Sequence, residues 1–225
     1  FGIGQVPSGT KDPFGLRRIA LAILHIVEHF GWSLSLHEVV HKSLSLYGDK
    51  VNGGVETVEQ VVSFIRERLV NDQLSKGADG GAVAAVTAVD FDDVNDSLSR
   101  IEALTLIRNE DAFAVLAASF KRIRNIIKEN EAMDVDGELL GEGAEKELAT
   151  LFAKLAAKVQ PMLDSRDYQG ALSAMLALKE PVDTFFDQVM VMDDDPAVRS
   201  NRLNLLTAIA GLFLQVGDIS KMHSA

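Results

Sequence analysis

The segment His37-Glu38-Val39-Val40-His41 has the residue types and the spacing of a zinc hydrolase motif. Two histidines four residues apart share one face of a helix, where both can bind zinc while the glutamate acts as general base. Such a site also needs a third protein ligand and an open coordination position. No Gly-x-x-His sequence follows the motif, and Glu59 is only one of several similarly spaced glutamates. The sequence therefore offers two zinc ligands without a clear third.

A structural role explains the same residues. Ser35 and Glu38 have the spacing of a capping box, which would start a helix and engage the glutamate in its first turn. We therefore interpret His37, Glu38 and His41 as a chance motif and expect no metal ligands. The sequence also has no Gly-x-Ser-x-Gly elbow, no Gly-x-x-x-x-Gly-Lys phosphate loop and no cysteine. We predict no catalytic residue in this chain.

Apolar residues recur at helical spacing along nearly the whole chain, and the two-residue alternation of strands is almost absent. The predicted fold class is all-α, with helices over residues 13–30, 35–48, 55–74, 92–107, 111–128, 144–163, 168–178, 182–189 and 196–216. Asp12-Pro13 and Asp195-Pro196 have the pattern of a helix start. The residues predicted to face the core from the first helix are Phe14, Ile19, Ile23, Ile26, Val27 and Phe30.

The glycine-rich stretch 76–81 predicts a joint between two helical units, because glycine leaves the backbone free to turn. We expect a first unit over residues 1–76 and a second, a helical bundle, over residues 82–225. The acidic, glycine-containing segment 129–143 lacks helical spacing and is predicted to be a solvated loop. The chain opens with Phe1 and not methionine, so we expect it to be cut from a longer polypeptide.

The chain has 22 basic and 33 acidic residues and a formal net charge of −11. This balance argues against sequence-independent coating of nucleic acid, and we expect no DNA partner. No apolar run reaches the roughly 18 residues that cross a bilayer, and no stretch has the pattern of an export signal. We expect no membrane contact and a cytoplasmic protein.

One local strip departs from the acidic average. On a helix over residues 111–128, Lys121, Arg124, Asn125 and Lys128 share the outer side, and Arg122 lies toward one flank. The residues predicted to face the core are Val115, Leu116, Phe120, Ile123 and Ile127. Four cations without an intervening acid could bind phosphate. Alternatively, they form a solvated face that complements the negative end of the helix dipole.

This strip lies in a segment with a family resemblance. Residues 120–126, Phe-Lys-Arg-Ile-Arg-Asn-Ile, resemble the Phe-Lys-Arg-x-x-Asn-Ile segment of the helical anticodon-binding domain shared by arginyl-tRNA synthetase and the bacterial glycyl-tRNA synthetase β subunit. Residues 2–18 look like the Gly-Gln-x-Pro-[Ser/Thr]-Gly-x-Lys-Asp-Pro-Phe-x-Leu-Arg-Arg signature of that β subunit. Residues 181–192 are similar to its Pro-Val-Asp-x-Phe-Phe-Asp-x-Val-Met-Val-Met run, and residues 199–203 and 216–220 also match.

The resemblance implies the C-terminal part of a β subunit in an α2β2 ligase that attaches glycine to tRNA(Gly). It implies that residues 1–76 end a helical region related to the HD fold and that residues 82–225 form the anticodon-binding domain. ATP and magnesium would be used by the α subunit, and no cofactor is expected in this part of β. The implied partners are tRNA(Gly) and the α subunit.

Anticodon recognition needs cations for phosphates and amides for base edges. The candidate tRNA-binding residues are Lys121, Arg122, Arg124, Asn125, Lys128, Arg199, Asn201 and Arg202. Further candidates for tRNA or interdomain contacts are Lys11, Arg17, Arg18, Arg66 and Arg68.

Two alternatives stay open for the cations outside the strip. The cluster at residues 199–202 could instead cap and pair with Asp193, Asp194 and Asp195 at the helix start, and the arginines of the first unit could pair with Glu67 and Asp72. A different function is also open, in which the chain is a helical scaffold that docks the α subunit through residues 185–192.

Overall fold

The computed structural model describes residues 1–128, 130, 131 and 133–222, and within these residues the fold is all-α, as predicted. The first helices are α1 (Leu16–Phe30), α2 (Leu36–Ser45), α3 (Val55–Ser75), α4 (Gly80–Thr87) and α5 (Val94–Ile107). The others are α6 (Asp111–Ile127), α7 (Ala144–Asp164), α8 (Tyr168–Met175), α9 (Lys179–Gln188) and α10 (Pro196–Leu214). Short 3-10 turns are η1 (Gly48–Lys50), η2 (Gly137–Leu139), η3 (Leu176–Leu178) and η4 (Ile219–Met222).

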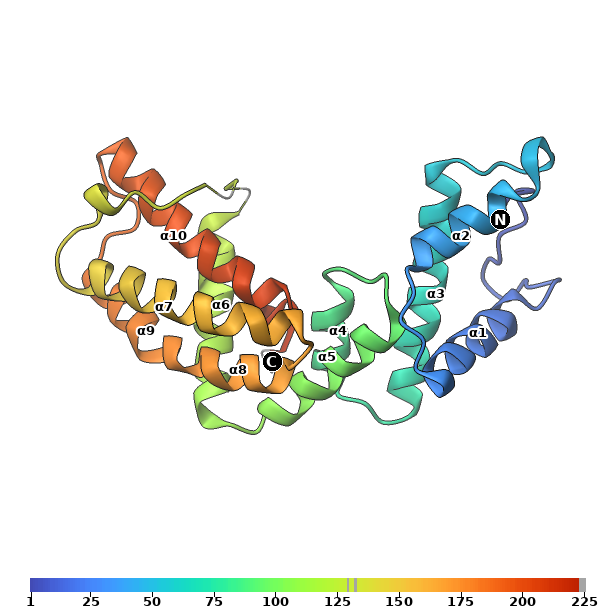
Figure 1. Ribbon diagram of the computed structural model, residues 1–225, viewed down its shortest axis with the longest axis horizontal. Coiled ribbons are helices and arrows are strands. Elements are labelled where there is room, and N and C mark those ends of the chain that lie inside the picture. The colour runs from blue at the N-terminus through green and yellow to red at the C-terminus, as the bar shows by residue number, and fades with distance from the viewer. Residues whose placement is uncertain (129, 132, 223–225) are drawn as a thin grey trace.

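The molecule is elongated, with α1, α2 and α3 at one end and α6 to α10 at the other (Figure 1). Helices α4 and α5 lie between the two ends. No helix in the described part of the chain is long and apolar enough to cross a membrane.

Two hydrophobic cores correspond to these two ends. The N-terminal core is built from α1, α2 and α3, and it also includes Phe91 and Val94. The C-terminal core runs from Ala82 to Met222 and includes residues of α4 to α10. Helix α5 therefore contributes its first turn to one core and Ile101 and Leu104 to the other, so that it fastens the two units together.

Helix α4 was not predicted from the sequence. Gly80 and Gly81, expected in a joint, are its first two residues, and the carboxylate of Asp79 caps it by accepting the backbone N–H of Ala82 at 2.8 Å. Its apolar residues form a continuous run and not a one-sided stripe, because the helix is packed between α5 and η4. Ala84 is exposed, but it is as apolar as its buried neighbours, so the residue types show no helical periodicity.

The predicted core face of α1 is largely wrong. The buried residues of this helix are Ala20, Leu24 and Val27, and only Val27 was among those predicted. The predicted residues that are exposed are Phe14, Ile19, Ile23, Ile26 and Phe30. The helix also starts later than predicted, because Gly15 has a φ of 64° and lies before its first residue. Asp12 still caps it, since its carboxylate accepts the backbone N–H groups of Leu16 and Arg17 at 2.8 and 3.0 Å.

The helix starts predicted at Ser35 and at Asp195-Pro196 are confirmed, whereas α9 begins at Lys179 and not at the predicted Val182. The Ser35 hydroxyl accepts the backbone N–H of Glu38 at 3.0 Å and starts α2. Asp195 caps α10, with Pro196 as the first helical residue. Helix α2 ends at Ser45 and not at Gly48, because the backbone tightens into η1 at that point.

Candidate nucleic-acid interface

Helix α6 has the orientation that the sequence predicted, with one correction. Leu116, Phe120, Ile123 and Ile127 are buried, and the Phe120 ring packs edge-on against Phe213 of α10 with centroids 5.5 Å apart. Val115, predicted to be buried, is exposed. The apolar side of α6 is thus fixed against the C-terminal core, and its opposite side faces solvent.

The solvent side of α6 carries the predicted cations, and we name Lys121, Arg122, Arg124, Asn125 and Lys128 the α6 strip. All of these except the half-buried Arg124 are exposed. Among the described residues, no carboxylate lies within 4.0 Å of the cationic groups of the strip. No ion pair within the described part of the chain therefore has to be broken before these side chains bind a phosphate.

Contacts with α9 fix the flank of the α6 strip. The guanidinium carbon of Arg122 lies 4.1 Å from the centre of the Phe186 ring, an arrangement in which the ring face attracts the cation. One turn earlier, the hydroxyl of Ser119 donates a hydrogen bond to Asp183 at 2.7 Å. These two contacts join α6 to α9 and hold the strip on a rigid support.

The C-terminal end of the strip is fixed by α10. Lys128 ends α6 with a φ of 44°, a left-handed value that is uncommon for lysine and turns the chain away from the helix. Two residues later, the Asn130 amide donates hydrogen bonds to Asn204 and Thr207 at 3.3 and 3.0 Å. The strip therefore ends at the surface, next to the middle of α10.

The second predicted cluster, at the start of α10, has its polar groups occupied within the protein. Asn201 is 3% exposed, and its amide both accepts the backbone N–H of Asp136 at 2.7 Å and donates to the Asp136 carbonyl at 2.9 Å. Arg199 donates to the carbonyl of Asp193 at 2.6 Å. The described part of the predicted loop 129–143 is thus held against α10 by a side chain that was expected to contact RNA.

Arg202 is also committed to internal contacts. Its guanidinium lies 2.9 Å from the buried carboxylate of Glu145 and 2.6 Å from Asp193, and it donates to the Met190 carbonyl at 2.9 Å. The pKa of Asp193 is lowered, first by the backbone N–H of Asp195 and then by Arg202. The structure therefore favours the cap-and-pair alternative for this cluster, and we leave Asn201 and Arg202 out of the proposed contact surface.

Three of the five basic candidates in the N-terminal unit have partners within the protein. Arg17 donates to the Gly9 carbonyl at 2.7 Å, and Arg66 donates to the Ser63 hydroxyl at 3.3 Å. Arg68 pairs with Glu67 at 3.2 Å, as the alternative expected. The remaining two candidates, Lys11 and Arg18, are exposed.

In the zinc-like motif, His37 is linked to residues other than His41. Its Nδ1 lies 2.6 Å from Asp92, and its Nε2 lies 3.2 Å from Glu59 of α3. The hydrogen bond to Asp92 is the main cause that raises the pKa of the imidazole, and Glu59 adds to it. His41 is exposed, and Val39 of the same motif is exposed as well. This arrangement ties α2 to α3 and to the segment before α5.

A different acidic cluster contains His25, Glu28 and Asp72, whose ligand atoms lie within 4.8 Å of one another. The ammonium of Lys76 lies in the same cluster, 3.2 Å from Glu28 and 2.8 Å from Asp72. Because a cation already neutralises both carboxylates, this cluster is a salt-bridge network between α1 and α3.

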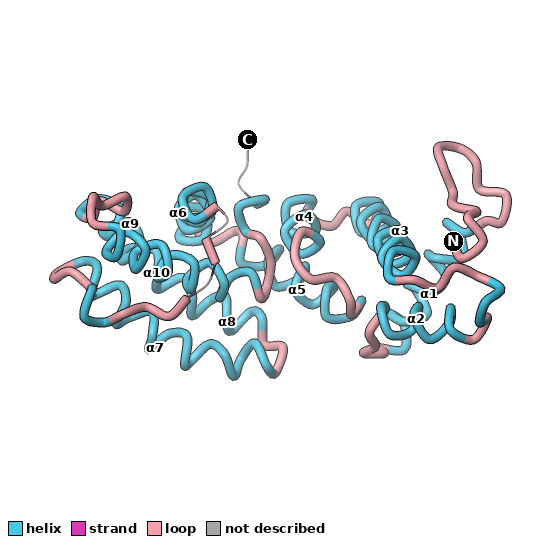
Figure 2. The backbone as a smooth tube through the Cα atoms, turned by 90° about the horizontal axis from the view of Figure 1, so that it is seen from above, coloured by secondary structure: helices cyan, strands magenta, loops and turns pink. Residues whose placement is uncertain are grey.

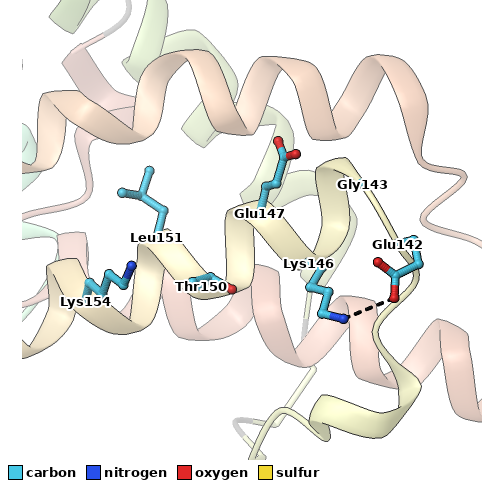
Figure 3. Close-up of a pocket in the computed structure, with 7 residues that line it drawn as sticks. All are labelled: Glu142, Gly143, Lys146, Glu147, Thr150, Leu151 and Lys154. Atoms are coloured by element: carbon cyan, nitrogen blue, oxygen red, sulfur yellow. Dashed lines mark hydrogen bonds and ion pairs between the residues drawn. The ribbon is translucent and has the colours of Figure 1, made fainter.

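The first half of α7 borders a surface hollow. Its lining residues are Glu142, Gly143, Lys146, Glu147, Thr150, Leu151 and Lys154 (Figure 3). Lys146 pairs with Glu142 at 3.0 Å, and the other side chains project along the helix without converging on one point. Helix α7 lies on the opposite side of the C-terminal bundle from α6 (Figure 2). The hollow therefore does not extend the α6 strip.

Comparisons with known proteins agree with the resemblance of the motifs. Residues 1–88 match the family described as glycyl-tRNA synthetase beta subunit, and residues 116–219 match the DALR anticodon binding domain. Nearly the whole chain matches the C-terminal part of glycyl-tRNA synthetase beta subunits. The DALR match contains the whole α6 strip.

Curated relatives support the same assignment. The chain is 43% identical to a glycine-tRNA ligase beta subunit of Aeromonas salmonicida, with 99% of this chain and 33% of the relative covered. It is 41% identical to those of Geobacter sp. (strain M21) and Pseudomonas aeruginosa (strain LESB58), covering 99% and 98% of this chain and 32% of each relative. The chain thus spans about a third of the length of these relatives.

Proposed function

We propose that this chain is the tRNA-binding, anticodon-recognising part of the non-catalytic β subunit of glycine-tRNA ligase. It holds tRNA(Gly) in the cytoplasm while the α subunit, which uses ATP and magnesium, attaches glycine. The observation that supports this most is the α6 strip, whose solvent-facing cations have no ion-pair partner among the described residues and lie within the match to an anticodon-binding domain.

The chemistry of the strip suits an anticodon loop. Unpaired bases are recognised on their edges while cations hold the backbone phosphates. Lys121, Arg124 and Lys128 supply the cations, and the exposed amide of Asn125 lies among them on the same helix face, where it can hydrogen-bond a base.

Arg122 differs from the other cations because it is already stacked on Phe186. A guanidinium fixed in this way presents its second face with little loss of side-chain entropy, which favours stacking on a base, while its charge and edge N–H groups stay available to a neighbouring phosphate.

The acidic surface outside the α6 strip helps to orient the RNA on the protein. With a net charge of −11, most of the protein repels an RNA backbone, and the α6 strip is a local exception. Such a distribution directs a polyanion to one face and disfavours other approaches.

Binding of tRNA(Gly) transcripts with normal and altered anticodons, at two salt concentrations, tests the proposal. We expect the altered anticodons to bind more weakly at both concentrations. Equal binding would refute anticodon recognition even if RNA binding were real, and a lack of binding would refute both.

A second function, docking of the α subunit through residues 185–192, is favoured by one observation. Met190 and Met192 are strongly exposed, although Phe185 and Val191 beside them are buried. If this is the main role, association with the α subunit survives replacement of Lys121, Arg122 and Arg124 by alanine, whereas tRNA binding is the property lost under the first proposal.

A further inference from the structure

Helix α1 has a wider apolar surface than the rest of the chain covers. Ile19, Ile23, Ile26 and Phe30 follow helical spacing and are between 41% and 60% exposed. At about 100° per residue, these four lie within an arc of about 60°. The buried residues of the helix occupy the adjoining arc and pack toward α3. One continuous apolar side is therefore half covered, and we name the exposed half the α1 face.

No charge interrupts the α1 face. By the same spacing, the charged residues Arg17, Arg18 and Glu28 and the imidazole of His25 lie at least about 80° from the nearer edge of this arc. The imidazole of His29 flanks the α1 face, with its ring centroid 4.9 Å from that of Phe30. Beyond the end of the helix, the ring of Trp32 stacks on Phe30 with centroids 5.2 Å apart and planes 18° apart, and it is 50% exposed. An apolar stripe of this length is typical of a surface that another helix covers.

Within the chain, α1 packs mainly on α3 and to a smaller extent on α5. It lies at the end of the molecule remote from α6 to α10 (Figure 1). The absence of cations from the α1 face disfavours RNA as its occupant, because RNA binding depends on phosphate contacts. The partner must therefore be apolar.

The relatives supply such a partner. About two thirds of their length lies outside the match, which is their C-terminal part. Phe1 lies beside α3, with its ring 5.2 Å from that of Phe64, and the Gly2 carbonyl accepts the backbone N–H of Asn52 at 2.7 Å. Polypeptide preceding Phe1 would therefore reach the same unit that carries the α1 face.

We propose that the α1 face docks against an apolar helix from the polypeptide that precedes this segment in glycyl-tRNA synthetase beta subunits. That contact completes the N-terminal helical unit. It joins the unit to the rest of β and does not depend on tRNA binding.

Hydrogen exchange of the α1 amides tests the proposal in two proteins, the 225-residue chain and a polypeptide extended upstream to the length of the curated relatives. We expect exchange in α1 to slow by at least about tenfold in the extended protein, without the α subunit. Equal exchange would overturn the proposal. So would slowing that appears only when the α subunit is added, or only as the concentration of the short chain rises, which would indicate a second copy.

A pair of variants makes the test specific. Replacing Ile23 and Ile26 with glutamate should leave the circular dichroism of the short chain unchanged, because both side chains are exposed, and should abolish the added protection in the extended protein. Leu106→Glu is the matched control, because Leu106 is 52% exposed on α5 and lies outside the α1 face. If the control removes protection as strongly as the double variant, the proposed contact is wrong.

Discussion

Replacing Lys121 and Lys128 with alanine should reduce the salt dependence of tRNA binding by a calculable amount. The α6 strip carries four cations, and among the described residues none of them pairs with a carboxylate. Each can therefore neutralise one phosphate of a single-stranded loop. The expected slope of log K against log salt is about −0.7 per contact, or about −2.8 for the strip.

Removing two of the four contacts makes this slope less steep, at about −1.4. Raising the salt concentration from about 50 to 200 mM should then weaken the contribution of the strip to tRNA binding by about 50-fold in the unchanged protein and by about 7-fold in the variant. The absolute affinity at low salt should fall as well. Both lysines are exposed, so the fold should be unaffected, which circular dichroism would verify.

Fluorescence anisotropy with a labelled tRNA(Gly) transcript, titrated at a series of salt concentrations, measures the slope directly. Lys154→Ala with Lys158→Ala is the matched control, because it removes the same charge from exposed positions of α7, on the far side of the bundle (Figure 2). An unchanged slope in the α6 variant, or an equal change in the α7 control, would refute the assignment of the strip to phosphate binding.

Three further predictions concern the structure itself. Asn201→Ala should lower the free energy of unfolding by about 1–3 kcal/mol, because it removes both hydrogen bonds between the buried Asn201 amide and the backbone of Asp136, whereas Asn125→Ala at the surface should change it little in urea unfolding. Because the pKa of His37 is raised in the folded state, its stabilising contribution is complete below its ordinary pKa of about 6.5 and is lost as pH rises through the raised value. Urea unfolding between about pH 6 and pH 9 should therefore show a decline in stability that His37→Gln abolishes and His41→Gln, the exposed control, leaves unchanged. After dialysis against zinc, elemental analysis should find the same substoichiometric metal content before and after His37→Ala; stoichiometric zinc lost in that variant would revive the hydrolase interpretation.

The sequence was sufficient to predict the α6 strip. Its apolar residues repeat at helical spacing, so the side of α6 that faces the core, and hence the side that presents Lys121 and Lys128, follows from local geometry. Caps such as Asp195-Pro196 are equally local, because the acceptor and the N–H groups it satisfies lie within a few residues.

The same spacing rule was insufficient for α1 and α4. In α1 it identified apolar residues correctly but could not say which half of a wide apolar side α3 covers, because that depends on the packing angle between two helices. In α4 it had no polar side to detect, since the residues from Gly80 to Val86 are all glycine, alanine or valine.

Tertiary structure decided which charged side chains are available to a ligand. The nearby Asp193 offered Arg202 an ion pair, but the sequence left open whether that pair or an RNA contact would form. In the folded protein, the guanidinium of Arg202 pairs with the carboxylate of Glu145, which lies 57 residues earlier in the sequence. No described carboxylate pairs with Lys121. Helical periodicity depends on neighbours a few residues away and is encoded locally; ion pairing depends on which distant segments the core brings together.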